Sequence, residues 1–527
     1  MKLASTLAGG MAAAVALAAA STPAHAAVTG LYGGGGTLAE KVYRDLFNRY
    51  GSTSGGDLCA GLATVCPTTH YNSDVEILYV GVGSGNGLKA LDNYDPTLYV
   101  SGGKKPDAVP TPSGSDLGTF YGTGSGATWV PGTGVGPYFP KVTFSGSDDS
   151  LSATDVAAVA AHGFGPVVQL PGIVTAIAVP FQPSSGWNPK GAQPIGGSSK
   201  VQLSLNTLCG IFNGDITTWN NAEIKKDNKN TVLGTGPITV VYRHDGSGTT
   251  FLFTNALLNQ CGTGAHPNPK STHPIPDQWV TDNGASVTVN GSAPFYKSGT
   301  SFFINVFNAG HLPSTFINNS TLTGVSGGAN GSGGVKAAIL NTPGSIGYVS
   351  PDFVLPVDNT GPQAANLQTY ISFKNGTTPI YKAPTPATAT PIMAGTTPPS
   401  FVGSPSPASN PLNWGALNPL PIAPGAYPIG GFSFINFYSC YSSVDVVNAL
   451  VSPTAGNVGY LKWYYGNNST NGGIPAQILA NDGFAPVPAS WAAAINKLVS
   501  DPNLGIGSPK VGKKAGTRAC KAITNGA

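Results

Sequence analysis

The sequence predicts an α/β protein built from at least two lobes. Three separate stretches follow the same order of strand, glycine-rich turn, hydroxyl residue and helix start, at Thr37, at Ser84 and at Ser247 to Thr249. Apolar, β-branched runs predict the strands, and apolar side chains at helical spacing predict the helices. With 527 residues, of which 41% are hydrophobic, the chain can bury more than one core.

The N-terminus is predicted to be a secretory signal at residues 1–26. Lys2 supplies a charged start, Met11–Ala20 is small and apolar, and Ala24-His25-Ala26 fits a cleavage site. Because no later apolar run is long enough to cross a bilayer, we expect a soluble protein that is periplasmic or secreted. A retained membrane anchor is the alternative.

The composition argues against one class of partner and predicts long loops. Charged residues make up only 9% of the chain and the net charge is +3, so we expect no nucleic-acid partner. Glycine (72) and proline (45) are abundant. Two stretches with little periodicity, 92–140 and 357–425, are predicted to be insertions that form surface loops.

The helices and strands follow in chain order. The first half is predicted to contain a helix at 39–50, a strand at 75–82, a short helix at 88–91, a strand from 142 that ends at Asp148, a helix at 151–161 capped by Ser152, and a buried strand at 167–181. The second half is predicted to contain a helix at 203–213, a strand at 238–242, a helix at 249–258, a helix at 334–341, a strand at 344–349, a strand at 427–437, interrupted helices at 444–466 and a helix at 489–498. Thr37 is the expected N-cap of the first helix.

The stretch around Arg243 has the chemistry of an anion site. A helix start offers free backbone N–H groups and the positive end of the helix dipole, and Ser247 and Thr249 add hydroxyl groups at that end. The planar fork of arginine matches two oxygens of a tetrahedral oxyanion, and the chain has only four arginines. A capped helix with a solvated arginine explains this stretch equally well when it is judged alone.

Asp148 is informative because a carboxylate repels an anion that has no proton. In an open α/β sheet, loops of this kind collect at the carboxyl ends of the strands, so we expect Asp148, Arg243 and the three helix starts to converge. Phosphate keeps at least one proton near neutral pH, whereas sulfate does not. Asp148 would therefore accept a hydrogen bond from phosphate and repel sulfate.

Six cysteines in an exported chain predict three disulfides, for which 15 pairings are possible. Cys59 and Cys66 flank one short loop and form a natural local pair. Cys209 and Cys261 bracket the central stretch, and a bond between Cys440 and Cys520 would tie down the C-terminal tail. No spacing typical of a zinc site is present, so we expect no metal.

The motifs resemble those of a known family, the periplasmic phosphate-binding proteins of phosphate ABC importers, and most closely its extracellular DING branch. The similar segments are Tyr242-Arg243-x-Asp245-Gly246-Ser247-Gly248-Thr249-Thr250, Gly34-Gly35-Gly36-Thr37-Leu38, Gly81-Val82-Gly83-Ser84-Gly85-Asn86-Gly87, Ser145-Gly146-Ser147-Asp148, Leu208-Cys209-Gly210-Ile211-Phe212 and Tyr348-Val349-Ser350-Pro351-Asp352-Phe353. The resemblance spans roughly residues 30 to 525 outside the two insertions. The chain departs from the family by lacking the Asp-Ile-Asn-Gly start and by carrying the insertions and the Cys59/Cys66 pair.

The resemblance implies a type II periplasmic-binding-protein fold, in which two lobes joined by hinge strands close on a ligand. It implies lobe 1 at 27–177 and 348–527 and lobe 2 at 178–347, with hinge segments near Ile177–Val179 and Tyr348–Val349. The implied phosphate ligands are Thr37, Leu38 through its amide, Ser84, Asp148, Arg243, Ser247, Gly248 through its amide, and Thr249. The family's cysteine pattern also implies the pairs Cys209–Cys261 and Cys440–Cys520.

The resemblance further implies a monomeric, non-catalytic protein without a cofactor. Its ligand would be inorganic phosphate, with arsenate as a near-isosteric alternative. Whether it feeds an ABC importer in the inner membrane or acts as a free scavenger stays open.

Two rival functions are considered. A secreted phosphatase or esterase would need a nucleophile elbow or clustered metal ligands, but one Gly-x-Ser-x-Gly match, Gly324–Gly328, lies in a glycine-rich loop and the seven histidines are scattered. A surface adhesion module carried by the insertions is the second rival, and it could coexist with phosphate binding.

Overall fold

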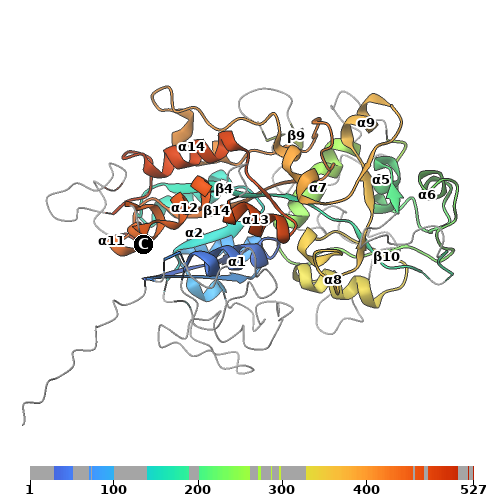
Figure 1. The fold of residues 1–527 in the computed structure, drawn as a ribbon, viewed down its shortest axis with the longest axis horizontal. Helices are drawn as coiled ribbons and strands as arrows, with labels where there is room; N and C mark the ends of the chain where they lie inside the picture. The colour runs from blue at the N-terminus through green and yellow to red at the C-terminus, as the bar shows by residue number, and fades with distance from the viewer. Residues whose placement is uncertain are drawn as a thin grey trace, which may run out of the picture.

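Two lobes, each with its own β-structure, lie side by side in the computed structural model (Figure 1). The first and last parts of the chain, blue, cyan and red in the figure, form one lobe, and the green and yellow middle part forms the other. The structure describes residues 29–51, 71–99, 139–188, 201–261, 271–273, 286–287, 296–297, 328–454, 457–467, 473–508, 520 and 526–527, apart from 73, 140 and 185. The predicted signal, Cys59 and Cys66, most of the first insertion and nearly all of Gly324–Gly328 lie outside these residues.

The first lobe is organised around a six-stranded sheet with the order β17-β4-β14-β3-β1-β2. Its strands are β1 (Thr29–Gly35), β2 (Val75–Gly81), β3 (Phe144–Ser147), β4 (Val167–Ala176), β14 (Gly430–Tyr438) and β17 (Ala485–Pro486). β1 runs parallel to β2 and to β3. The carboxyl ends of these three strands therefore meet at one edge of the sheet, which brings together the loops that follow them.

Aromatic packing holds helices against this sheet. The helices of the lobe are α1 (Glu40–Tyr50), α2 (Ser84–Asn93), η1 (Pro96–Tyr99), α4 (Ala153–Ala161), α11 (Val444–Val451), α12 (Tyr460–Asn467), α13 (Ile474–Asn481) and α14 (Ala489–Ser500). On α1, the ring of Tyr43 packs edge-on against Tyr79 of β2 at 5.5 Å, and Phe47 packs against Phe144 of β3 at 5.6 Å. The apolar residues whose spacing predicted this helix, Val42, Leu46 and Phe47, are all buried.

The antiparallel pair β4–β14 contains a bulge beside the predicted site. Its register shifts between Ser433 and Phe434, where Pro171 and Gly172 stand on the opposite strand. Proline cannot donate a ladder hydrogen bond, so a bulge is its usual place inside a sheet. The carbonyl oxygens of Pro171 and Gly172 accept hydrogen bonds from the hydroxyls of Tyr465 and Tyr464 at 2.8 and 2.7 Å. Both carbonyl groups at the bulge therefore have a hydrogen-bond partner.

The second lobe contains two small sheets, with the orders β11-β5-β10-β7 and β13-β12-β6. Their strands are β5 (Pro180–Phe181), β6 (Gln202–Leu203), β7 (Thr239–Val240), β10 (Ser345–Ile346), β11 (Gln363–Ala364), β12 (Asn366–Gln368) and β13 (Tyr381–Lys382). The helices are α5 (Leu205–Asn213), α6 (Ala222–Asp227), α7 (Gly248–Cys261), α8 (Gly331–Asn341) and α9 (Tyr370–Asn375). Two strand pairs complete the described part, β8 (Ser286–Val287) with β9 (Tyr296–Lys297) and β15 (Pro453–Thr454) with β16 (Asn457–Val458).

The two predicted hinge segments pair with each other. The amide of Ala178 donates to the carbonyl oxygen of Val349 at 2.9 Å, and the amide of Val349 donates back to Ala178 at 3.0 Å. The predicted strand at 167–181 is therefore divided between β4 in the first lobe and β5 in the second. Two chain segments cross side by side here, as expected for lobes joined by hinge strands.

Sheet membership departs from the predicted assignment of residues 348–527 to the first lobe. β11 pairs with β5, and β12 pairs in parallel with β6, so residues 363–382 belong to the sheets of the second lobe. The chain then returns to the first lobe at α10 (Pro386–Ala389), where Tyr427 donates its amide to Thr388 at 2.9 Å. This late return to the first lobe was missed because strand pairing over more than 150 residues leaves no local pattern.

The prediction of a surface loop at 357–425 was wrong for much of that stretch. Beyond β11 to β13 it contains η7 (Thr390–Met393), η8 (Pro407–Ser409) and η9 (Pro411–Trp414). Ile392, Met393 and Trp414 are buried, and η7 and η9 pack on β4. The abundant prolines are used as first-turn residues of these short helices, where the missing N–H costs nothing, rather than as markers of an exposed loop.

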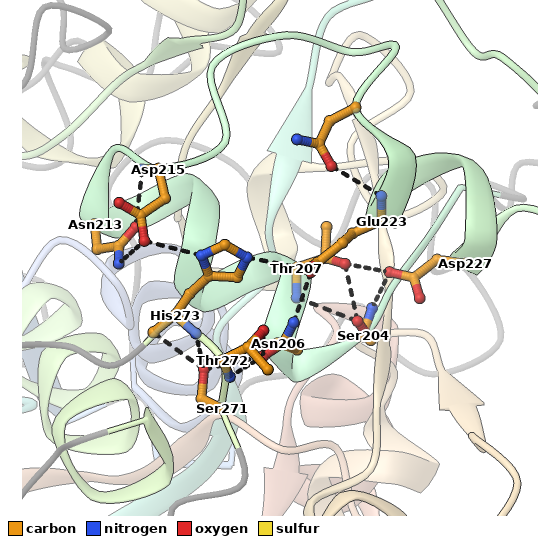
Figure 2. Close-up of polar contacts among 11 residues, drawn as sticks. Ser204, Asn206, Thr207, Asn213, Asp215, Glu223, Asp227, Ser271, Thr272 and His273 are labelled. Atoms are coloured by element: carbon orange, nitrogen blue, oxygen red, sulfur yellow. Dashed lines mark hydrogen bonds and ion pairs between the residues drawn. The ribbon is translucent and has the colours of Figure 1, made fainter.

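Covalent and ionic contacts tie down parts of both lobes. Disulfides join Cys209 to Cys261 and Cys440 to Cys520, with Cα–Cα distances of 6.2 and 5.5 Å. In the second lobe, the ring of His273 lies between the carboxylates of Asp215 and Glu223, with Nδ1 2.8 Å from the first and Nε2 3.0 Å from the second (Figure 2).

Within the described ranges, no helix combines the length and the apolar character needed to span a membrane.

Candidate oxyanion site

The segments that follow the three parallel strands of the first lobe meet in one place, and two predicted site residues, Ser84 and Asp148, lie there. Ser84 is the first residue of α2, and its hydroxyl accepts the amide of Asp148 at 3.3 Å. Gly36 follows β1 and lies beside these two side chains. A Cβ atom on Gly36 would be 3.1 Å from Ser84 Oγ and 3.3 Å from both carboxylate oxygens of Asp148. Both side chains are buried. Glycine at this position lets the backbone approach a ligand beside them.

Thr37 does not cap the first helix, which corrects the sequence prediction. The N-cap of α1 is Ala39, and no side chain caps this helix. Two residues separate Thr37 from the first helical residue, so its hydroxyl cannot reach the amides of the first turn. The Oγ1 of Thr37 instead accepts from Arg243 Nη2 at 3.3 Å, across the two lobes. The following residue, Leu38, buries its side chain fully.

Arg243 is held in place by Asp245, two residues later. The Nε of Arg243 donates to Asp245 Oδ1 at 2.7 Å, and Nη2 contacts Oδ2, so the pair is bidentate. Oδ1 also accepts the amide of Gly331 at the start of α8 at 3.0 Å. Burial would raise the pKa of Asp245, but the charge and hydrogen bonds of Arg243 outweigh it and hold the pKa below its usual value. This clamp fixes the plane of the guanidinium.

The start of α7 lies at the same place. Ser247 accepts the amide of Thr250 at 3.1 Å and therefore caps the helix that begins at Gly248. The hydroxyl of Tyr348, which lies beside the hinge, accepts the amide of Arg243 at 3.0 Å and contacts Thr250 Oγ1 at 2.9 Å. The returning strand of the second lobe thus supports both the arginine and the helix start.

The two lobes touch at these loops. The amide of Gly85 in the first lobe donates to the carbonyl oxygen of Gly246 in the second at 3.3 Å. Together with the contact between Thr37 and Arg243, this hydrogen bond spans the interface. The structure is therefore a closed arrangement in which side chains of both lobes surround one small region.

Asp148 is the electrostatic exception in this region. Its side chain is 1% exposed, and neither carboxylate oxygen has a hydrogen-bond partner among the described residues. Burial raises the pKa of Asp148 to about 6, although the nearby hydroxyls of Ser433 and Ser84 and the charge of Arg243 act to lower it. A buried carboxylate without a partner is costly, and an incoming group with a proton to donate would satisfy it.

The arrangement can bind a small tetrahedral oxyanion. It offers a clamped guanidinium, the hydroxyls of three separate chain segments, and the positive ends of the α2 and α7 helix dipoles. All the predicted ligand residues are buried, and they lie in the segments that follow β1, β2 and β3 or that lead into α7; they are Thr37, Leu38, Ser84, Asp148, Arg243, Ser247, Gly248 and Thr249. In the described part of the chain, no group of three or more His, Cys, Asp or Glu side chains is placed to hold a metal ion.

Sequence reasoning missed two residues at this place. Ser433 of β14 stands beside Asp148 because of antiparallel pairing with β3, which no local motif reveals. Ser332 of α8 lies against Thr37, with its Oγ 3.4 Å from Thr37 Oγ1. The run Gly331-Ser332-Gly333-Gly334 has the glycine and hydroxyl signal of the other helix starts, but no recognisable strand precedes it.

Comparison with known proteins places the chain in a family. The family description "PBP superfamily domain" matches residues 51–467. Alkaline phosphatase L of Pseudomonas aeruginosa (strain UCBPP-PA14) is 28% identical over 517 residues, which cover 94% of this chain and 96% of that protein. A phosphate-binding protein from an unknown prokaryotic organism is 29% identical over 411 residues, which cover 70% of this chain and 84% of that protein.

The fold has also been seen in solved structures. One, described as a high-affinity periplasmic phosphate-binding protein (PfluDING) bound with phosphate at pH 8.5, superimposes with a TM-score of 0.56 at 24% identity, covering 94% of this chain and 99% of that one. This similarity concerns the fold, and it agrees with the two-lobe architecture and the hinge strands described above. The resemblance inferred from the motifs is confirmed, and this chain belongs to the PBP superfamily with a type II periplasmic-binding-protein fold.

Proposed function

We propose that this protein binds inorganic phosphate and performs no chemistry on it. The observation that carries the proposal is the buried carboxylate of Asp148, which has no hydrogen-bond partner among the described residues and lies among donors. Donors alone would suit any oxyanion, whereas a carboxylate acceptor suits one that carries a proton. The names of the phosphate-binding relatives support the same ligand.

The proposed phosphate ligands are the residues named from the sequence. Arg243 supplies the positive charge, and Thr37, Ser84, Ser247 and Thr249 supply hydroxyl groups. The amide of Leu38, two residues ahead of α1, and that of Gly248, the first residue of α7, supply N–H donors. Asp148 accepts the phosphate proton. Closure of the lobes along the hinge would bury the ion.

Delivery of phosphate to an ABC importer is the proposed biological role, for a monomer located in the periplasm or outside the cell. The family of two-lobe binding proteins and the predicted secretory signal support this role. Cell fractionation and size-exclusion chromatography with light scattering would test the location and the monomeric state.

A phosphatase is the second candidate, because relatives that align over nearly the whole chain carry the name alkaline phosphatase L. The site argues against it on physical grounds. Hydrolysis of a phosphomonoester requires space for the leaving group, whereas the proposed ligand residues are buried by both lobes. An open form of the protein could admit an ester, so the two functions have to be separated by experiment.

The test is a calorimetric titration of ligand-stripped protein with phosphate, with sulfate in a parallel titration and p-nitrophenyl phosphate turnover measured on the same preparation. We expect phosphate to bind more tightly than about 10 μM, which is roughly −7 kcal/mol, with no heat from sulfate and no turnover. Equal binding of the two anions would contradict the role of Asp148. Turnover that is lost in Arg243→Ala would establish the phosphatase instead.

A further inference from the structure

The α8 helix brings a fourth glycine-rich start to the proposed site. Ser332 is its second residue and is fully buried. Asp245 fixes this start, because Oδ1 accepts both the amide of Gly331 at 3.0 Å and the Nε of Arg243 at 2.7 Å. The same carboxylate therefore positions the arginine and the beginning of α8. Figure 1 places α8 on the side of the second lobe that faces the first.

Ser332 contacts Thr37 of the first lobe through two atoms. The amide of Ser332 donates to Thr37 Oγ1 at 3.4 Å, and the two hydroxyl oxygens are 3.4 Å apart. Arg243 Nη2 is a second donor to the same oxygen at 3.3 Å. A hydroxyl has one proton and two lone pairs. With both lone pairs facing N–H donors, Thr37 can only use its proton to donate.

We propose that Ser332 is a positioning residue that holds the hydroxyl of Thr37 as a donor toward the bound anion. In the structure, Ser332 Oγ can accept the hydrogen bond that the Thr37 hydroxyl donates. When the Thr37 hydroxyl donates to an oxyanion instead, the Ser332 hydroxyl can turn and donate to Thr37 Oγ1, sharing that lone pair with its own amide, and it thereby keeps α8 against the first lobe. Ser332 thereby couples ligand binding to lobe closure. This inference rests on the proposed function, since it assigns Thr37 to the phosphate site.

A double-mutant cycle tests the coupling. Phosphate affinity and release rate would be measured for the wild type, Ser332→Ala, Thr37→Val and the double variant. Losing one neutral hydrogen-bond partner should weaken phosphate binding roughly 3- to 10-fold, mainly through faster release. In the Thr37→Val background, Ser332→Ala should change the affinity less than about 2-fold, because the partner is already gone.

Ser345→Ala is the matched control. Ser345 is also a fully buried serine in contact with α8, but its hydroxyl donates to the carbonyl oxygen of Ile339 at 3.0 Å near the other end of the helix. The control should lower the unfolding temperature without changing phosphate release. Midpoints of thermal unfolding without ligand would be recorded for every variant, so that a loss of folded protein is not counted as a loss of affinity.

Three results would overturn the inference while leaving phosphate binding intact. They are wild-type affinity in Ser332→Ala, additive effects of Ser332→Ala and Thr37→Val, and the same loss of affinity in Ser345→Ala. A wild-type protein that binds no phosphate would instead overturn the proposed function itself, and the inference with it. Failure of the inference would therefore be seen in the variants, whereas failure of the proposed function would be seen in the wild type.

Discussion

Gly248 of the second lobe lies against the backbone of Asp148 of the first. A Cβ atom on Gly248 would stand 2.6 Å from Asp148 Cβ and 2.7 Å from both its Cα and its backbone nitrogen. These atoms cannot rotate away, in contrast to the end of a flexible side chain. The absence of a side chain at the first residue of α7 therefore sets how closely the two lobes can approach at the site.

We expect Gly248→Ala to weaken phosphate binding at least about 10-fold, because the added methyl group separates the lobes and removes contacts worth more than about 1.4 kcal/mol. The stability of the ligand-free protein should change little, since alanine favours a helix over glycine. Calorimetry would measure the affinity. Gly333→Ala is the matched control at the start of α8, where the nearest atom to a new Cβ is 3.9 Å away. Wild-type affinity in Gly248→Ala would show that the lobes do not close as in this structure.

Asp148→Asn should relax the discrimination between phosphate and sulfate. The amide removes the buried negative charge that repels a fully ionised anion and adds N–H donors. We expect sulfate to give measurable binding heat in this variant, whereas phosphate loses a charge-assisted hydrogen bond worth about 1.5–3 kcal/mol. Parallel titrations with both anions would measure the change. Continued rejection of sulfate would mean that other groups determine the selectivity.

Lowering the pH should relax the discrimination between phosphate and sulfate in the wild type, as Asp148→Asn does. Since burial raises the pKa of Asp148 to about 6, its carboxyl group is ionised above that pH and protonated below it. A protonated carboxyl can donate to sulfate, so sulfate binding should appear as the pH falls through about 6. Titrations with sulfate between pH 5 and 8 would show this. In Asp148→Asn, sulfate binding should show no such transition, which makes that variant the control.

The ring of His273 should stabilise the second lobe only while it is protonated. A neutral imidazole has a single N–H, whereas both ring nitrogens face carboxylates, those of Asp215 and Glu223 (Figure 2). Burial would lower the pKa of His273, but its hydrogen bonds to these two groups raise it above the usual value. The stabilisation is therefore complete below the pKa of the unfolded chain and is lost as the pH rises through the folded pKa.

We expect His273→Gln to lower the free energy of unfolding by at most about 1 kcal/mol, the range of partly exposed ion pairs. The difference should be largest near pH 5 and fade toward pH 9. Thermal unfolding at several pH values would measure it. His162→Gln is the control, because the Nε2 of that ring contacts the backbone carbonyl oxygen of Asp92 rather than a carboxylate. A difference independent of pH would contradict the ionic interpretation.

Removing the Cys209–Cys261 disulfide should destabilise the protein without disturbing the site. The bond closes a loop with a sequence separation of 52, for which the chain-entropy relation gives about 4 kcal/mol. Cys261 is the last residue of α7 and Gly248 is the first, so the helix separates the bond from the site by about 20 Å. The double variant Cys209→Ser/Cys261→Ser should therefore unfold earlier in denaturant and bind phosphate within about 3-fold of the wild type. A large loss of affinity would show that the bond also positions α7.

Most helices and strands could be predicted from the sequence because their signals are local. The apolar face of the helix at 39–50, the capping residue Ser152 and the run at 75–82 all appear where the pattern placed them. The prediction that Thr37 caps the first helix was wrong because the residue at which a helix starts depends on backbone geometry over one or two residues. The prediction of a surface loop at 357–425 was wrong because the composition of this segment resembles that of loops, although much of it packs against the rest of the protein.

What the sequence by itself determined is the chemistry of the site: one arginine beside a helix start, hydroxyl residues in glycine-rich turns, and a carboxylate at a strand end. Only the tertiary structure decided how these groups meet. It brought Ser332 to Thr37, Ser433 to Asp148 and Gly248 against Asp148, and it returned residues 363–382 to the second lobe. The physical reason is that local backbone preferences act over a few residues, whereas strand pairing and lobe closure here join segments 100 or more residues apart.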